Sequence, residues 1–230
     1  MESPIRITRP ADFFHDLADF RSRRLELISS DLSPITLEKG AKVLLHLVSK
    51  TAFDESAFVD VQSLDRPLLP LFTGSSNIRY NFDGRLTYSE GTEGVRSYVQ
   101  LFHSGVIEAV YVFAELDDKR IIPSTSLRSN LIEATGSYLK KQQMLDVKLP
   151  IAVTLTFSGV KGYRLAVAEE YQGYDQYPID RDTLLMPQTF VNSFESEVSN
   201  VLRSLFDRLW NAAGFARCFQ YDKEVNTIES

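Results

Sequence analysis

Residues 97–113 read SYVQLFHSGVIEAVYVF. Two runs rich in β-branched and aromatic residues flank the short segment His103-Ser104-Gly105. This pattern predicts two antiparallel strands joined by a hairpin, because such side chains suit a pleated surface and glycine suits a tight turn. The stretch therefore places an antiparallel sheet at the centre of the predicted fold.

A second hairpin is predicted just before this one. Residues 78–88 read IRYNFDGRLTY, with β-rich residues on both sides of Asp83-Gly84. An Asp-Gly pair is a strong hairpin signal, because both turn positions need positive φ. The two hairpins together predict about four strands in an antiparallel meander.

Further strands are predicted outside the meander. Residues 43–49, VLLHLVS, form a short apolar run typical of a buried strand, and residues 149–157, LPIAVTLTF, predict a longer one. The next segment, FSGVKGYRL at 157–165, has two readings, a phosphate-binding loop or the turn of a hairpin. A phosphate loop of this kind leads into a helix, whereas the residues after Gly162 alternate like a strand, so the hairpin is favoured.

Three helices are predicted from apolar residues that recur every three to four positions, over residues 10–30, 123–146 and 194–213. The arginines at 21, 23 and 24 are assigned to a solvated face of the first helix. The predicted fold class is α+β: a mostly antiparallel sheet of hairpins and a meander, two long helices packed on one face, and an extra N-terminal helix. Residues 1–36 form the N-terminal helix and linker, and residues 37–230 form a single α+β domain.

Composition limits the class of protein. The chain has 230 residues, a formal net charge of −6 and one cysteine, Cys218. The acidic balance argues against a nucleic-acid module, which usually carries a net basic face. One cysteine cannot form an internal disulfide, and neither a bilayer-spanning stretch nor a signal peptide is apparent. We expect a cytoplasmic protein with no membrane association.

Candidate catalytic groups are few and scattered. The histidines lie at 15, 46 and 103, and with one cysteine they do not match the ligand set of a zinc site. His46 is predicted to be a hydrogen-bonded core residue, and Cys218 an inert packing residue. The carboxylates Asp175, Asp180 and Asp182 could bind magnesium, but a loop braced by Arg181 is the favoured reading. No catalytic residue, metal site or cofactor is predicted.

A set of segments in one order carries a family resemblance: YNFDGRLTY, SYVQLFHSGVIEAV, IPSTSLRSNLIEA, GVKGYRLAV, PIDRDTLLMP and LRSLFDRLWNAAGF. From about residue 40 onward the chain resembles the C-terminal region of bacterial proteins that carry an N-terminal Schlafen/AlbA-like domain and are labelled DNA-binding or ATP-binding. The AlbA-like domain itself is absent here, so no functional residue carries over. The resemblance implies a companion module, and a chain that is a fragment or a shortened relative.

Three functional hypotheses follow. The first is a non-catalytic accessory module that acts through protein contacts or self-association, with an exposed docking face on the first helix made of Phe13, Phe14, Leu17 and Phe20. The second is a nucleic-acid or nucleotide binder whose basic patch gathers Lys148, Lys161 and Arg164, together with the lysines at 140 and 141. The third is a metal-dependent hydrolase that uses the three aspartates named above.

Overall fold

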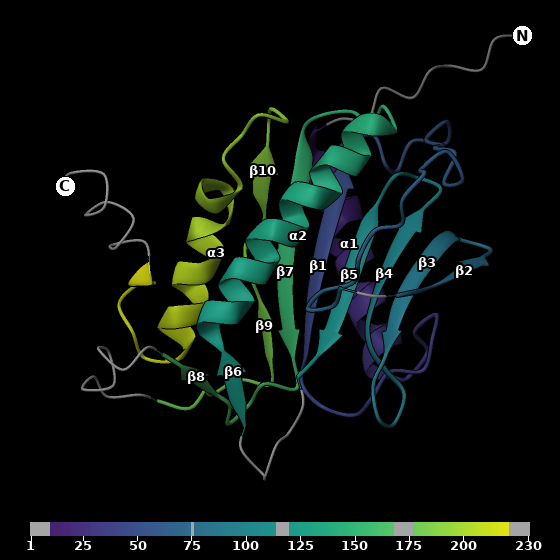
Figure 1. The fold of residues 1–230 in the computed structure, drawn as a ribbon. Helices are drawn as coiled ribbons and strands as arrows, with labels where there is room; N and C mark the ends of the chain where they lie inside the picture. The colour runs from purple at the N-terminus through teal and green to yellow at the C-terminus, as the bar shows by residue number, and fades with distance from the viewer. Residues whose placement is uncertain (1–9, 75, 114–119, 168–176, 221–230) are drawn as a thin grey trace, which may run out of the picture.

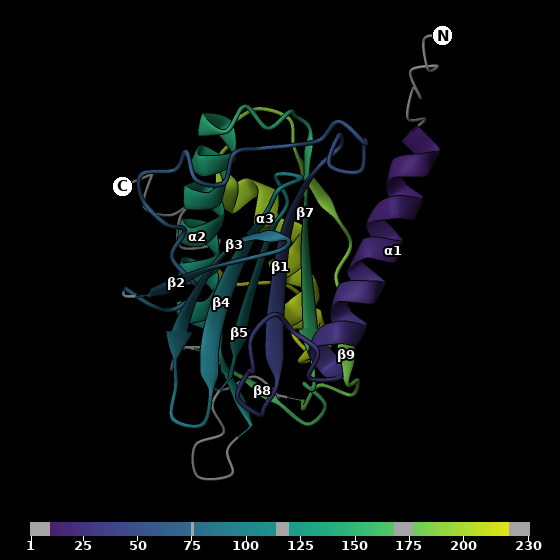
Figure 2. The same ribbon diagram turned by 90° about the vertical axis from the view of Figure 1, so that its right-hand side faces the viewer.

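The fold has three layers, with one sheet between two helical layers (Figures 1 and 2). The computed structural model describes residues 10–74, 76–113, 120–167 and 177–220. The elements in chain order are α1 (Pro10–Ser29), β1 (Lys42–Ser49), β2 (Asn77–Asn81), β3 (Gly84–Glu90), β4 (Val95–Phe102), β5 (Ile107–Val112), β6 (Ile121–Pro123), α2 (Ser124–Met144), β7 (Ile151–Ser158), β8 (Arg164–Ala166), β9 (Thr183–Leu185), β10 (Thr189–Val191) and α3 (Val198–Ala212). The predicted α+β class is confirmed.

The main sheet has eight strands in the order β10-β7-β1-β5-β4-β3-β2, and β9 also pairs with β7. All of its pairings are antiparallel. Strands β2 to β5 are consecutive neighbours, as the predicted meander requires. The central strand β1 lies between β5 and β7, so an element from early in the chain joins the meander to the later strand β7.

Helices α2 and α3 cover one face of the sheet. Because side chains alternate along a strand, Val43, Leu45 and Leu47 of β1 point into the core on this face. Helix α3 buries a stripe at helical spacing, and its first turn is capped by Glu197, whose carboxylate accepts a hydrogen bond from the Ser199 N–H. The buried residues of the stripe are Leu202, Leu205, Phe206, Leu209 and Trp210.

Helix α1 covers the opposite face, away from α2 and α3 (Figure 2). Leu44 and Val48 of β1 point to this face and belong to the clusters that contain residues of α1. The two long helices thus lie on one face, as predicted, and the extra N-terminal helix packs on the other face of the same sheet. The N-terminal helix is an integral layer of the fold, because the alternate side chains of the central strands are also apolar and need cover.

The two predicted hairpins are present, with one change of register. His103-Ser104-Gly105 lies between β4 and β5 as predicted, and Gly105 has φ +80°. In the first hairpin Asn81 pairs with Gly84, so the turn residues are Phe82 and Asp83. The Asn81 side-chain oxygen accepts hydrogen bonds from the backbone N–H groups of Asp83 and Gly84, and this contact sets the turn one residue earlier than the Asp-Gly pair predicted.

The segment FSGVKGYRL is not a hairpin. Strand β8, which follows it, pairs in parallel with β6 in a separate two-stranded sheet. Strand β7 already pairs with β1 on one side and with β9 and β10 on the other, so no edge is left for β8. Gly159 and Gly162 have φ +73° and +84°, and they turn the chain out of the main sheet. Of the helices in the described ranges, none combines the length and apolarity needed to cross a bilayer.

Candidate functional site

A row of buried polar side chains crosses the sheet beneath α1. In the strand register Gln100 of β4 lies opposite Glu108 of β5, Glu108 opposite His46 of β1, and His46 opposite Thr154 of β7. None of the four side chains is more than 1% exposed. Buried polar groups are costly unless they are hydrogen-bonded, so this row is the first place to look for chemistry.

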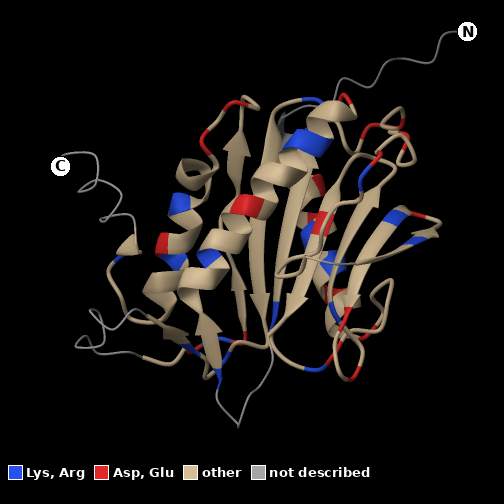
Figure 3. Cartoon of the chain, viewed as in Figure 1, with Lys and Arg blue, Asp and Glu red and all other residues tan. Residues whose placement is uncertain are grey.

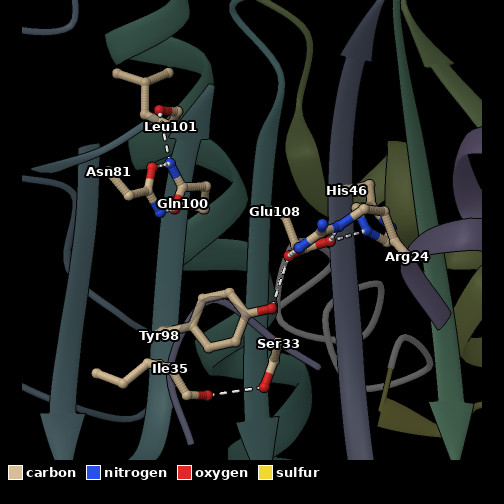
Figure 4. Close-up of polar contacts among 9 residues, drawn as sticks. All are labelled: Arg24, Ser33, Ile35, His46, Asn81, Tyr98, Gln100, Leu101 and Glu108. Atoms are coloured by element: carbon tan, nitrogen blue, oxygen red, sulfur yellow. Dashed lines mark hydrogen bonds and ion pairs between the residues drawn. The ribbon is translucent and has the colours of Figure 1, made fainter. Parts of the chain in front are cut away.

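Glu108 is the centre of this row (Figure 4). Arg24 of α1 donates two hydrogen bonds to its carboxylate, at 2.7 and 2.6 Å. The Tyr98 hydroxyl donates a third at 2.7 Å, and His46 Nε2 lies 3.0 Å from the second oxygen. Since an ionised carboxylate only accepts, His46 Nε2 carries the hydrogen in this contact. We call Arg24, Glu108, His46 and Tyr98 the Glu108 cluster.

The electrostatics of the Glu108 cluster favour one charge state. Burial alone would raise the pKa of the Glu108 carboxyl, but the hydrogen bonds from Arg24 and His46 outweigh it and lower the pKa to about 2. Burial would lower the pKa of Arg24, and the contacts with Glu108 raise it instead. The pKa of Tyr98 is raised, first by burial and then by the neighbouring carboxylate. The pair is thus an ionised guanidinium and carboxylate at neutral pH.

This arrangement stabilises the fold and leaves little capacity for reaction. A carboxylate offers about four lone-pair sites, and four donors occupy those of Glu108. A carboxyl with a pKa of about 2 is also a poor general base near neutral pH, where the matching pKa lies close to the operating pH. The cluster therefore serves as a clamp between α1 and the sheet.

Sequence reasoning missed this clamp because it assigned the arginines of α1 to solvent. Arg21 and Arg24 follow Phe13 and Leu17 at helical spacing, so they lie on the same inward stripe. Arg21 donates to the carbonyl oxygens of Leu155 and Met186, at 3.2 and 3.0 Å. The position of Arg21 and Arg24 on the apolar stripe of the helix is the sequence feature that could have predicted these buried contacts. The predictions that His46 and Cys218 are buried are confirmed, with each 1% exposed.

The predicted docking face on α1 is wrong for its central residues. Phe13 and Leu17 are each 2% exposed and pack against Val48 and Ala152 of the sheet. Phe20 is partly buried in the same cluster, 5.2 Å from the His46 ring in an edge-to-face contact. Phe14 alone of the four is exposed, and its ring still meets Phe190 of β10 at 5.9 Å. The face is occupied by the protein's own sheet.

The predicted basic patch does not form as a single surface. Lys148 precedes β7, whereas Lys161 and Arg164 follow it, and a strand of this length separates its ends by about 23 Å at ~3.3 Å per residue. Lys161 and Arg164 lie near Arg120, whose guanidinium would be 3.5 Å from a Cβ on Gly162. Acidic residues share this end of the fold, where Figure 3 shows red and blue segments together around β6 and β8.

Of the three carboxylates in the magnesium alternative, the structure describes Asp180 and Asp182. Both are exposed and flank Arg181, just after the buried Ile179, and Asp180 lies 3.6 Å from the Arg181 guanidinium, as the favoured loop reading expects. Asp175 lies outside the described residues. Within the described ranges no three His, Cys, Asp or Glu side chains are grouped to hold a metal ion.

A solvent-open hollow of about 530 Å³ lies between α2 and the start of α3. Its lining mixes one cation with two carboxylates, Arg128, Glu133 and Glu197, and Glu197 is already used as the cap of α3. The guanidinium offsets one of the two carboxylates, so the lining mixes both signs of charge and does not point to a ligand of particular chemistry.

Three exposed apolar side chains lie together at the β2 edge of the sheet, which we define as Ile78, Tyr80 and Phe82 on the β2–β3 hairpin. Among the residues that the structure describes, strand β2 is the last strand of the sheet and pairs only with β3, and most of its residues are exposed. Ile78, Tyr80 and Phe82 are 46%, 52% and 98% exposed. An unpaired strand edge that also presents apolar side chains is a template for another chain.

The opposite edge of the sheet is protected. Strands β9 and β10 have three residues each and are separated by Met186, Pro187 and Gln188, so neither offers a long unpaired ladder. Phe190 of β10 is covered by Phe14, and α3 packs next to β10. Short strands, proline and covering helices are the usual means of blocking an edge. Because the edge at β9 and β10 is protected and the edge at β2 is exposed, we take the β2 edge as the candidate functional site.

Comparison of the chain with known proteins gives no relative. No family model matches it, no curated protein matches it, and no solved structure matches it. The resemblance to the C-terminal region of Schlafen/AlbA-like proteins accordingly stays a prediction from the six quoted segments.

Proposed function

We propose that this chain is a non-catalytic module that acts through protein contacts, made at the β2 edge. The observation that carries the proposal is a strand that pairs on one side only within the described residues, with Ile78 and Tyr80 exposed on it and Phe82 exposed in the turn that follows. Main-chain hydrogen bonds from such an edge supply affinity to an added strand, and alternate side chains supply specificity.

The state of the ionisable groups supports a non-catalytic role. The most buried of them, the Glu108 cluster, has its charges paired and its carboxylate oxygens occupied. The companion role beside an AlbA-like nucleic-acid or nucleotide-handling domain, implied by the resemblance, fits a module of this kind and is part of the proposal.

Site-specific photo-crosslinking in the native cells tests this function. A benzoylphenylalanine in place of Phe82 projects from the turn and should form adducts with a protein in contact with the β2 edge. The matched control places the same group at Met144, which is 63% exposed at the end of α2. Adducts at 82 and not at 144 support the proposal. Equal yields at the two positions, or no adduct at either, contradict it.

A further inference from the structure

We propose that the occupant of the β2 edge is an extended acidic segment of another protein, with carboxylates on alternate residues and apolar side chains between them. This inference rests on the proposed function and names the chemistry of the partner. It is drawn from two arginines at the edge, Arg79 of β2 and Arg85 of β3, neither of which contacts a carboxylate within the described residues.

The two faces of β2 differ in chemistry. Arg79 lies opposite Leu86, which packs in a cluster with residues of α1, so Arg79 is on the α1 face of the sheet. Because side chains alternate along a strand, Ile78 and Tyr80 project to the other face, which carries α2 and α3. A strand added to β2 alternates in the same way. Its side chains therefore meet a guanidinium on one face and an apolar surface on the other.

The charged residues of the β2–β3 ladder are both cations. Between Asn77–Asn81 and the residues paired with them, 84–88, the ladder contains Arg79 and Arg85 and no acidic residue. The nearest acidic residues in the sequence lie at the two ends of the hairpin, Asp83 in the turn and Glu90 at the last position of β3. The middle of the edge is therefore positively charged.

Arg85 is a buried cation without an acidic partner. It is 7% exposed, donates to the carbonyl oxygen of Leu64 at 2.9 Å, and lies 5.9 Å from the ring centroid of Tyr80. Its Nε is buried and has no hydrogen-bond partner in the part of the chain that the structure describes. By contrast, Arg24 and Arg96 each contact a carboxylate. A buried charge is costly unless it is paired, so the charge of Arg85 favours the arrival of an anion at this edge.

Arg79 supplies the direct contact with the partner. It is exposed on β2, and one of its terminal nitrogens donates to the carbonyl oxygen of Pro34. A guanidinium has five donors in a planar fork, so other N–H groups are available to a carboxylate. A glutamate opposite Arg79 on an added strand would lie on the same face, with about 5 Å between the Cβ atoms. Opposite charges in such a cross-strand pair stabilise the pairing.

Tyr80 and Arg85 define the apolar half of the site. Residues on either side of that glutamate face Ile78 and Tyr80, where β-branched side chains pack well against an aromatic ring. Arg85 lies one strand farther in, opposite Tyr80, so it acts on the partner through its charge and holds the Tyr80 ring in place. A preformed edge loses less side-chain entropy on association.

Fluorescence anisotropy with three labelled peptides and the whole chain tests the inference. The peptides are heptapeptides of threonine, isoleucine and valine that differ only at the second, fourth and sixth positions, which are all glutamate, all glutamine or all lysine. We expect the glutamate peptide to bind about tenfold more tightly than the lysine peptide at low ionic strength, with the glutamine peptide between them. This difference should shrink in 0.5 M salt, because exposed charges are screened.

Three variants locate the preference. Arg79→Glu should reverse the order, so that the lysine peptide binds most tightly. Arg23→Glu makes the same change of charge at an exposed position on α1 and should leave the order unchanged. Arg85→Met should narrow the difference between the glutamate and lysine peptides about two- to threefold without reversing it. Circular dichroism confirms that the variants are folded.

The other outcomes overturn the inference. Equal affinity of the three peptides for the wild-type chain, tightest binding by the lysine peptide, or no binding of any peptide up to about 1 mM removes the acidic segment as the occupant. A preference for glutamate that Arg79→Glu leaves unchanged places the peptide elsewhere on the surface. The proposed function is tested separately by the photo-adduct at Phe82, which does not depend on the charge of the partner. An adduct at Phe82 together with equal peptide affinities keeps the proposed function and overturns only the acidic partner.

Discussion

Replacing Arg24 with methionine removes the guanidinium from the Glu108 cluster while keeping an unbranched apolar side chain against the sheet. Glu108 is fully buried, and its pKa is about 2 compared with an ordinary value of 4.5. That difference corresponds to about 3 kcal/mol of stability at neutral pH, at 1.36 kcal/mol for each pH unit. Breaking a buried ion pair by removing one partner typically costs ~3–5 kcal/mol, which agrees with the value derived from the pKa of Glu108.

The pH dependence of this loss has a definite sign. In the wild-type chain the folded pKa of Glu108 lies below its unfolded value, so its contribution is complete above pH 4.5 and is lost as the pH falls toward 2. In the Arg24→Met variant burial dominates and raises the pKa of Glu108, so the carboxyl takes up a proton instead. The free-energy difference between the two proteins should therefore be about 3 kcal/mol at pH 7 and should shrink as the pH falls. Above pH 4.5 it shrinks because the buried carboxyl of the variant takes up its proton, and below pH 4.5 because the wild-type chain loses the contribution of its ionised Glu108.

Urea denaturation followed by the fluorescence of Trp210, the single tryptophan, measures this difference. Trp210 is buried in α3, on the other side of the sheet, so it reports global unfolding. Arg23→Met is the matched control, because Arg23 is exposed on the same helix and should change stability by about 0.5 kcal/mol or less. Adding Glu108→Gln to Arg24→Met should recover part of the loss. A difference below 1 kcal/mol at pH 7, or one that is equal at pH 7 and pH 3, would refute the clamp.

Three further predictions concern the fold. A chain lacking residues 1–36 should bind a hydrophobic dye and lose its cooperative thermal transition, because α1 covers one face of the sheet; a cooperative transition in the shortened chain would make the helix dispensable. Phe13→Ala should lower the free energy of unfolding by about 3–5 kcal/mol and Phe14→Ala by about 1 kcal/mol or less, and similar losses in denaturant melts would contradict the burial assigned to them. Gly84→Ala should lower the melting temperature strongly, because Gly84 has φ +148° and an added Cβ would collide with the Leu101 carbonyl oxygen, whereas Gly74→Ala, with open space around it, should not.

The sequence predicted most strands and helices, because these elements are specified by interactions between residues that are close together in the chain. The apolar run in 43–49 and the glycines at 84 and 105 specify strands and turns through residues only a few positions apart. Two predictions in this class failed, one for a local reason and one because of contacts between strands far apart in the sequence. The Asn81 side chain moved the first turn by one residue, and the neighbours already paired with β7 excluded a hairpin after Gly159.

The candidate site could not be predicted in the same way, because it depends on contacts between distant residues. Arg24 and Glu108 are 84 positions apart, and their pairing is decided by which face of the sheet α1 covers. The position of β2 at the edge depends on strand order, because none of the described strands pairs with its outer side, and sequence periodicity does not specify strand order. Lys148 and Lys161 were predicted to converge because β7 and β8 were taken as one hairpin.

Amide hydrogen exchange of β2, followed by mass spectrometry, tests the proposed use of this edge most directly. In dilute solution we expect some β2 amides to exchange at least 100-fold faster than those of the central strand β1, because an edge strand leaves part of its backbone unpaired. Adding the protein identified by crosslinking at Phe82 should slow β2 and leave β1 unchanged. β2 amides that exchange as slowly as β1 in the dilute chain, or that no added protein slows, would contradict the account.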